Sequence, residues 1–156
     1  MYANGFLAFQ QGFSAGLMPD PVLWVDEWAD EHMRIPAGNG AEPGPYRTSR
    51  TPYAREVMRC LSPAHPCRRV VVMGASQLLK TQVALNWMGA SIHLAPGNML
   101  ALEPSLSLAK RLSGRIGKTI SEVPVLRERV SAPRSRDSRN TLDTKEFNGG
   151  TLFINS

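Results

Sequence analysis

Residues 70–81 read Val70-Val71-Val72-Met73-Gly74-Ala75-Ser76-Gln77-Leu78-Leu79-Lys80-Thr81, an apolar run that ends at a glycine and enters a helical pattern through Lys-Thr. This order predicts a strand, a tight turn and a helix whose positive N-terminus points at the turn. Backbone N–H groups in such a turn can surround a phosphate. The stretch therefore predicts a phosphate-binding loop.

The spacing of three residues supports a nucleotide site. In the pattern G-x-x-x-x-G-K-[ST], the lysine binds the β and γ phosphates and the following hydroxyl binds Mg²⁺. Gly74, Lys80 and Thr81 fit this spacing. The predicted nucleotide-binding residues are Gly74, Ala75, Ser76, Gln77, Leu78, Leu79, Lys80 and Thr81, with the Thr81 hydroxyl as the metal ligand.

Leu79 departs from this pattern because it takes the position of the second glycine. A leucine adopts a positive φ only at an energetic cost. The alternative interpretation is an ordinary strand-to-helix turn with an exposed lysine.

The residues after the loop favour a βαβ unit. Apolar residues predict a mostly buried helix over 81–92, and the run Met99-Leu100-Ala101-Leu102 predicts the next strand. A right-handed crossover would make strands 70–73 and 99–102 parallel in one sheet, with the loop at their carboxyl ends. Near the C-terminus, Asn148-Gly149-Gly150 predicts the turn of a β-hairpin between residues 141–147 and 151–154. The predicted fold class is α/β, an incomplete parallel sheet of the P-loop NTPase type with an N-terminal helical arm.

The two ends of the chain differ in charge. Of 156 residues with a formal charge of +5, residues 1–46 hold one arginine against six acids, and residues 47–156 hold 17 basic residues against seven acids. A Pro/Gly-rich connection over 35–51 suggests a boundary, which divides an acidic arm and linker (1–45) from the first part of an ATPase domain (46–156). The basic part favours a polyanionic partner such as DNA, and a solvated surface is the alternative.

Two further segments supply candidate binding residues. Thr51 and Pro52 predict a helix start just before the loop strand, where Tyr53 could stack on a base and Arg50 could contact a phosphate or base. A surface helix is the alternative. The predicted helix over 106–120 has an apolar stripe on one side and the candidate DNA-binding residues Lys110, Arg111, Arg115 and Lys118 on the other. A solvated helix face is the alternative there.

Other functional classes receive little support from the sequence. Cys60 and Cys67 have no metal-ligand spacing, and no segment approaches a membrane span. Glu103 ends an apolar run, as does the acid that assists Mg²⁺ in P-loop ATPases, but this run follows the loop helix directly and fits the next parallel strand better. A helix is predicted over 21–33, with Asp20 as its cap, and packing is favoured over partner docking for Trp24 and Trp28.

Five short motifs occur in a distinctive order. They are Trp28-Ala29-Asp30-Glu31, Glu42-Pro43-Gly44-Pro45-Tyr46-Arg47-Thr48-Ser49-Arg50-Thr51-Pro52-Tyr53, Ser76-Gln77 with Lys80-Thr81, Glu103-Pro104-Ser105, and Phe147-Asn148-Gly149-Gly150-Thr151-Leu152. In this order the chain, from about residue 24 to its end, resembles the lambda-type phage terminase large subunit. Loops of irregular sequence are familiar in that family.

The resemblance implies a viral DNA-packaging motor in which a P-loop ATPase drives duplex DNA into a procapsid and a C-terminal endonuclease cuts it. It implies ATP and Mg²⁺ as cofactors, with Lys80 on phosphate, Thr81 on the metal, and Arg50 and Tyr53 in the nucleotide-contacting segment. The implied partners are double-stranded DNA, the small terminase subunit, the portal and procapsid, and further copies of the full-length protein. The implied location is the host cytoplasm, without a membrane.

Two expectations limit the activity of these residues alone. Family members continue beyond the position of Ser156 into the acidic strand that orients the attacking water, and then into the nuclease. We therefore expect this chain by itself neither to hydrolyse ATP nor to cut DNA. A helicase-like P-loop ATPase fragment and a non-enzymatic basic DNA-binding remnant are the alternative functions.

Overall fold

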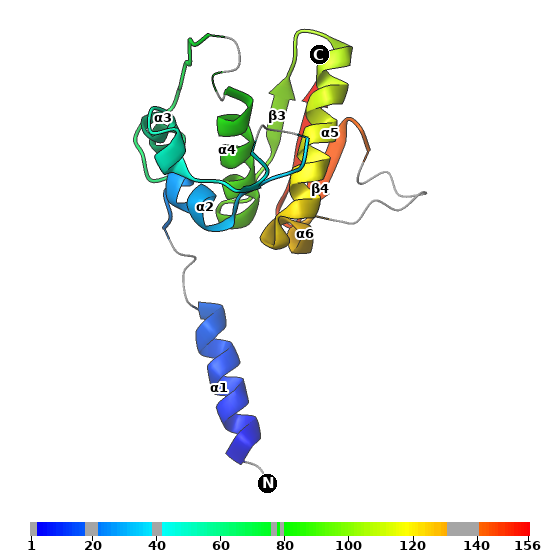
Figure 1. Ribbon diagram of the computed structural model, residues 1–156. Coiled ribbons are helices and arrows are strands. Elements are labelled where there is room, and N and C mark those ends of the chain that lie inside the picture. Colours follow the sequence, from blue (N-terminus) through cyan, green and yellow to red (C-terminus); the bar gives the residue numbers. More distant parts are fainter. Residues whose placement is uncertain (1–2, 18–21, 39–41, 76–77, 79, 131–140) are drawn as a thin grey trace.

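The computed structural model describes residues 3–17, 22–38, 42–75, 78, 80–130 and 141–156, and the fold is mixed α/β, with a small sheet and several helices (Figure 1). In chain order the elements are α1 (Ala3–Leu17), α2 (Val25–His32), β1 (Arg34–Ile35), β2 (Gly44–Pro45), the 3-10 helix η1 (Thr48–Arg50), α3 (Ala54–Cys60), α4 (Lys80–Leu94), β3 (Met99–Leu102), α5 (Leu106–Glu122), α6 (Pro124–Arg129), β4 (Thr144–Phe147) and β5 (Gly150–Asn155).

The larger sheet has three strands in the order β3-β5-β4. β3 and β5 are parallel, with Met99 opposite Leu152 and Leu102 opposite Asn155, whereas β4 and β5 form an antiparallel hairpin. Gly149 takes a φ of 89° in the hairpin turn, a conformation that favours glycine. The predicted hairpin and the predicted strand over 99–102 are confirmed.

The predicted strand over 70–73 is wrong. Residues 70–73 form no described strand, and Val71 and Met73 are 83% and 98% exposed. The β-branched residues favour an extended backbone, but a strand also requires a paired neighbour and a packed face. Among the described strands the neighbour of β3 is β5, so the parallel pair that we expected between 70–73 and 99–102 is absent from the described sheet.

One face of the sheet lacks a described helical cover. α5 packs against β5 on one side, where Ala101, Leu152 and Ile154 are buried. On the other side, Leu100 and Phe153 lie opposite each other in register and both are exposed, as is Leu102. Within the described sheet β3 is an edge strand.

The helices follow the apolar periodicity of the sequence. The helix predicted over 81–92 is α4, and the helix predicted over 106–120 is α5, which begins with the Ser105 hydroxyl accepting from the Leu108 N–H. The helix predicted over 21–33 is α2, which begins at Val25, so its predicted first turn is wrong. Glu27 accepts from the backbone N–H of Trp24 at this start, and Asp20, its predicted cap, lies outside the described residues.

The helical core forms where α2, α3 and α4 meet. Trp28 of α2 is 0% exposed and packs on Gly89 of α4, where an added Cβ would lie 2.4 Å from Trp28 Cη2. The indole N–H of Trp28 donates to His93 Nδ1 at 2.9 Å. Packing, the interpretation favoured for Trp28, is therefore confirmed, and glycine allows the close approach of the two helices.

The segment before this core contains α1, which extends away from the remaining elements (Figure 1). Its aromatic residues Phe6, Phe9 and Phe13 are exposed. The boundary near residue 45 remains a prediction, but α2, on its N-terminal side, shares a core with α3 and α4.

Candidate nucleotide-binding site

The candidate loop lies where α4 begins. Figure 1 shows the N-terminus of α4 at the same end of the molecule as the carboxyl ends of β3 and β5. Ligands of open α/β folds bind at this end of a parallel sheet. The start of α4 thus lies at this end, although residues 70–73 do not form a strand, and the binding loop stays a prediction.

The Lys80 side chain forms a hydrogen bond with the first residue of the candidate loop. Its Nζ donates to the carbonyl oxygen of Gly74 at 3.0 Å, and the Leu78 N–H donates to Ala75 O at 3.5 Å. All four residues are exposed. Ser76, Gln77 and Leu79 lie outside the described residues, so the conformation at the departure from the glycine pattern is not described.

The start of α4 has the chemistry that phosphate and Mg²⁺ require. The first turn of this 15-residue helix contains no acidic residue, so no carboxylate competes with an anion for its N-terminal N–H groups. Thr81, half-buried in that turn, offers a hydroxyl oxygen. Among the described residues no group of three His, Cys, Asp or Glu could hold a metal ion. The Thr81 hydroxyl is thus a possible single protein ligand for Mg²⁺, a metal that usually takes further ligands from phosphates and water.

The segment with Arg50 and Tyr53 lies between α2 and α3. Arg50, the last residue of η1, forms an ion pair with Glu42, and Tyr53, just before α3, is 59% exposed. Neither side chain bonds to a described residue of the 74–81 loop. The structure thus leaves both side chains accessible, but does not bring them into contact with Lys80.

Buried polar contacts connect this segment to the helices around it. Thr48 donates its backbone N–H to Asp30 Oδ1, and the Tyr46 hydroxyl lies 3.1 Å from Thr51 Oγ1. Burial raises the pKa of Tyr46; its hydrogen bonds to Thr51, Asn86 and Thr48 act in the opposite direction, while the Asp30 carboxylate raises it further. The contact with Thr51 therefore ties the buried Tyr46 to the turn that precedes α3.

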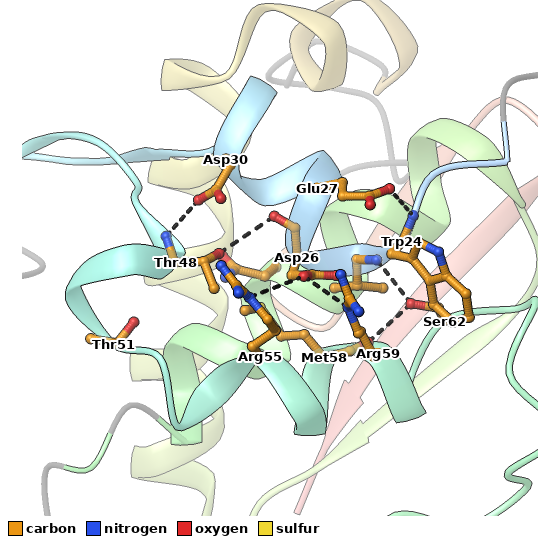
Figure 2. A network of polar contacts seen from close by, with 12 residues as sticks. Trp24, Asp26, Glu27, Asp30, Thr48, Thr51, Arg55, Met58, Arg59 and Ser62 are labelled. Atoms are coloured by element: carbon orange, nitrogen blue, oxygen red, sulfur yellow. Dashed lines mark hydrogen bonds and ion pairs between the residues drawn. The ribbon is translucent and has the colours of Figure 1, made fainter.

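A second polar cluster fixes α2 against α3 (Figure 2). Asp26 Oδ2 accepts from Arg59 Nε at 3.1 Å and lies 3.6 Å from Arg55 Nε. The Ser62 hydroxyl accepts from the Val25 N–H at 2.9 Å and donates to Met58 O at 3.0 Å. Sequence reasoning missed these links because their partners lie far apart in the chain. The available signal in the sequence was that acidic residues such as Asp26 stand among the apolar residues of the predicted helix.

Comparison with known families identifies the family of this chain. A family model described as phage terminase large subunit gpA, ATPase domain, matches residues 40–156. The chain belongs to this family. The family resemblance predicted from the motifs is thereby confirmed. Comparison with curated proteins gave no match, and comparison with solved structures gave none either.

The gpA-family chain has a basic surface on α5. Lys110, Arg111, Arg115 and Lys118 are exposed, opposite the buried residues Ala109, Leu112 and Ile116. The only acidic residue of this helix, Glu122, lies at its end. Such a surface suits a phosphate backbone. No described helix combines the length and apolar character that a membrane span requires.

Proposed function

We propose that this gpA-family chain forms the nucleotide-binding part of a DNA-packaging ATPase, with a fold of the P-loop NTPase type. The observation that carries this proposal is the position of Lys80. It is the first residue of α4, its amine reaches back to Gly74 O, and both lie at the carboxyl end of the parallel strands. The family match supports a packaging role over the helicase-like alternative.

Each proposed binding residue has a distinct role. The Lys80 ammonium would bind the β and γ phosphates, the loop 74–79 would supply backbone N–H groups, and the Thr81 hydroxyl would coordinate Mg²⁺. Tyr53 would stack on the base, and Arg50 would exchange Glu42 for a phosphate or the base. Hydrolysis of ATP held by these residues would supply the free energy that a packaging motor converts into DNA movement; these residues would provide the binding step.

The proposed partners follow from the family. They are double-stranded DNA, the small terminase subunit, the portal of the procapsid and other copies of the full-length protein, all in the host cytoplasm. We assign no endonuclease activity to these residues.

Replacing the loop lysine tests the proposal directly. We expect Lys80→Ala to weaken Mg-ATP binding by about tenfold or more, because a charge-assisted contact to phosphate is lost. Isothermal titration of the wild type and the variant with Mg-ATP gives the two dissociation constants. Lys118→Ala, which removes an exposed lysine of α5, is the matched control and should bind as the wild type does.

Equal binding by wild type and Lys80→Ala would overturn the nucleotide site. The turn would then be an ordinary connection into α4 with an exposed lysine. Binding of DNA without any response to ATP would favour the basic DNA-binding remnant.

The basic face of α5 gives a complementary prediction. We expect Lys110→Ala and Lys118→Ala each to reduce the slope of log K against log salt concentration by about 0.9 for duplex DNA, because each side chain neutralises one phosphate. Fluorescence anisotropy with labelled DNA at several salt concentrations gives these slopes. Lys80→Ala should leave them unchanged. Slopes that do not respond to the α5 variants would mean that this face is only a solvated surface.

A further inference from the structure

We propose that Asp30 is a positioning residue for the nucleotide site. Its carboxylate fixes the segment that carries Arg50 and Tyr53, and thereby determines how well the base of the nucleotide is bound. This inference rests on the proposed function, because it concerns the side of the same site that faces away from the phosphates.

The contact between Asp30 and Thr48 is a helix cap supplied from another element. Thr48 is the first residue of η1, so its N–H has no partner within that helix. Arg47, the residue before it, provides no side-chain cap. Asp30 of α2, 18 positions earlier in the chain, accepts this N–H instead (Figure 2). Because Thr48 is 0% exposed, loss of the Asp30 carboxylate removes the partner of a donor on a buried residue, which costs stability at this position.

Successive backbone hydrogen bonds connect Thr48 to the part of the chain that contains the candidate binding residues Arg50 and Tyr53. The Arg50 N–H donates to Arg47 O at 3.1 Å, and the Thr51 N–H donates to Thr48 O at 3.0 Å. The Ala54 N–H then donates to Thr51 O at 3.0 Å and leads into α3. Arg50 and Tyr53 lie within this hydrogen-bonded part of the chain. Their backbones therefore follow Thr48 rather than moving independently.

The same helix also holds the phosphate side of the site. Two residues before Asp30, Trp28 packs on Gly89 of α4, the helix that begins with Lys80. α2 thus contacts both the segment that would bind the base and the helix that would bind the phosphates. This arrangement explains how the segment with Arg50 and Tyr53 can keep a constant distance from Lys80, although no hydrogen bond is described between them.

Glu31 is a neighbouring acid without this role. Its carboxylate is exposed and lies 3.7 Å from His32 Nε2, on the same helix. A change at Glu31 therefore alters the charge of α2 by the same amount as a change at Asp30, but leaves η1 in place. Glu31→Ala is the matched control.

The test compares two ligands, Mg-ATP and Mg-tripolyphosphate, because the second has no base or ribose. We expect Asp30→Ala to weaken binding of ATP by about fivefold or more, the equivalent of one lost hydrogen bond at the segment. Binding of tripolyphosphate should stay within about twofold, since the loop and Lys80 are unchanged. Asp30→Asn, which keeps an acceptor oxygen, should restore most of the ATP affinity. Glu31→Ala should bind both ligands as the wild type does.

A double mutant shows whether Asp30 acts through the segment. Tyr53→Ala should give the same selective loss of ATP affinity, and adding Asp30→Ala to it should cost less than it costs in the wild type. If Asp30→Ala proves too unstable to purify, Asp30→Ser, whose hydroxyl is too short to replace the carboxylate, supplies the same comparison.

The possible results separate this inference from the proposed function. Equal weakening of ATP and tripolyphosphate, or no weakening of either, would overturn the positioning role while leaving the nucleotide site intact. Wild-type protein that binds neither ligand, or that binds both as Lys80→Ala does, would overturn the nucleotide site and the positioning role with it.

Discussion

Trp28→Ala is expected to lower the free energy of unfolding by about 3–5 kcal/mol, because it removes a large, fully buried side chain. The indole is 0% exposed, contacts Gly89, and donates its N–H to His93. Alanine would leave a cavity between α2 and α4 that two helices held by other contacts cannot fully close. Urea unfolding followed by far-ultraviolet circular dichroism gives the free energy of each protein.

Trp24→Ala is the control for this substitution. Trp24 is half-buried, and its ring contacts His65 and the Arg59 guanidinium at the edge of the core. We expect a loss of about 1 kcal/mol or less, because solvent already reaches part of this ring. Equal losses at the two positions would contradict a core centred on Trp28.

Gly89→Ala is expected to destabilise the protein by about 1–3 kcal/mol, although alanine is the better helix former. The reason is steric: the new methyl group would lie 2.4 Å from Trp28 Cη2 and 3.3 Å from Leu126 Cδ1. The two helices would have to separate or the indole would have to leave its position. The same urea titration measures this loss.

A second helical glycine gives the matched control. At Gly114 of α5 an added Cβ meets no atom within 4 Å, so Gly114→Ala should stabilise the protein by about 0.5–1 kcal/mol. In the Trp28→Ala background, Gly89→Ala should lose its cost, because the indole that it would clash with is gone. A cost that persists in that background would mean that the clash involves other atoms.

Local patterns in the sequence predicted most of the elements. Helices α4 and α5 follow from apolar spacing, β3 from a four-residue apolar run, and the hairpin from Asn148-Gly149, because each signal lies within the element that it specifies. The start of α2 was placed too early. The helix begins where the Glu27 carboxylate accepts from the Trp24 N–H, and sequence patterns place such boundaries only to within a few residues.

Contacts between distant segments could not be predicted in the same way. The run 70–73 has the composition of a strand, but strand formation depends on a pairing partner that composition does not specify. For the candidate site, motif spacing predicted Gly74 and Lys80 as binding residues but not the hydrogen bond between Lys80 Nζ and Gly74 O. The cap that Asp30 provides to Thr48 was not predicted either, because it depends on how α2 packs on its neighbours. In the sequence Gly89 is only a glycine within a helical pattern. Its contact with Trp28 became visible in the structure.

The uncovered side of the sheet has a practical consequence for work with this chain. Leu100, Leu102 and Phe153 form an apolar patch beside a described strand edge whose backbone groups can pair with another molecule. Self-association should therefore increase with protein concentration. It should also increase at high ionic strength, because salt screens the repulsion between the positively charged molecules. Dilute, low-salt buffers are the suitable starting point for handling it.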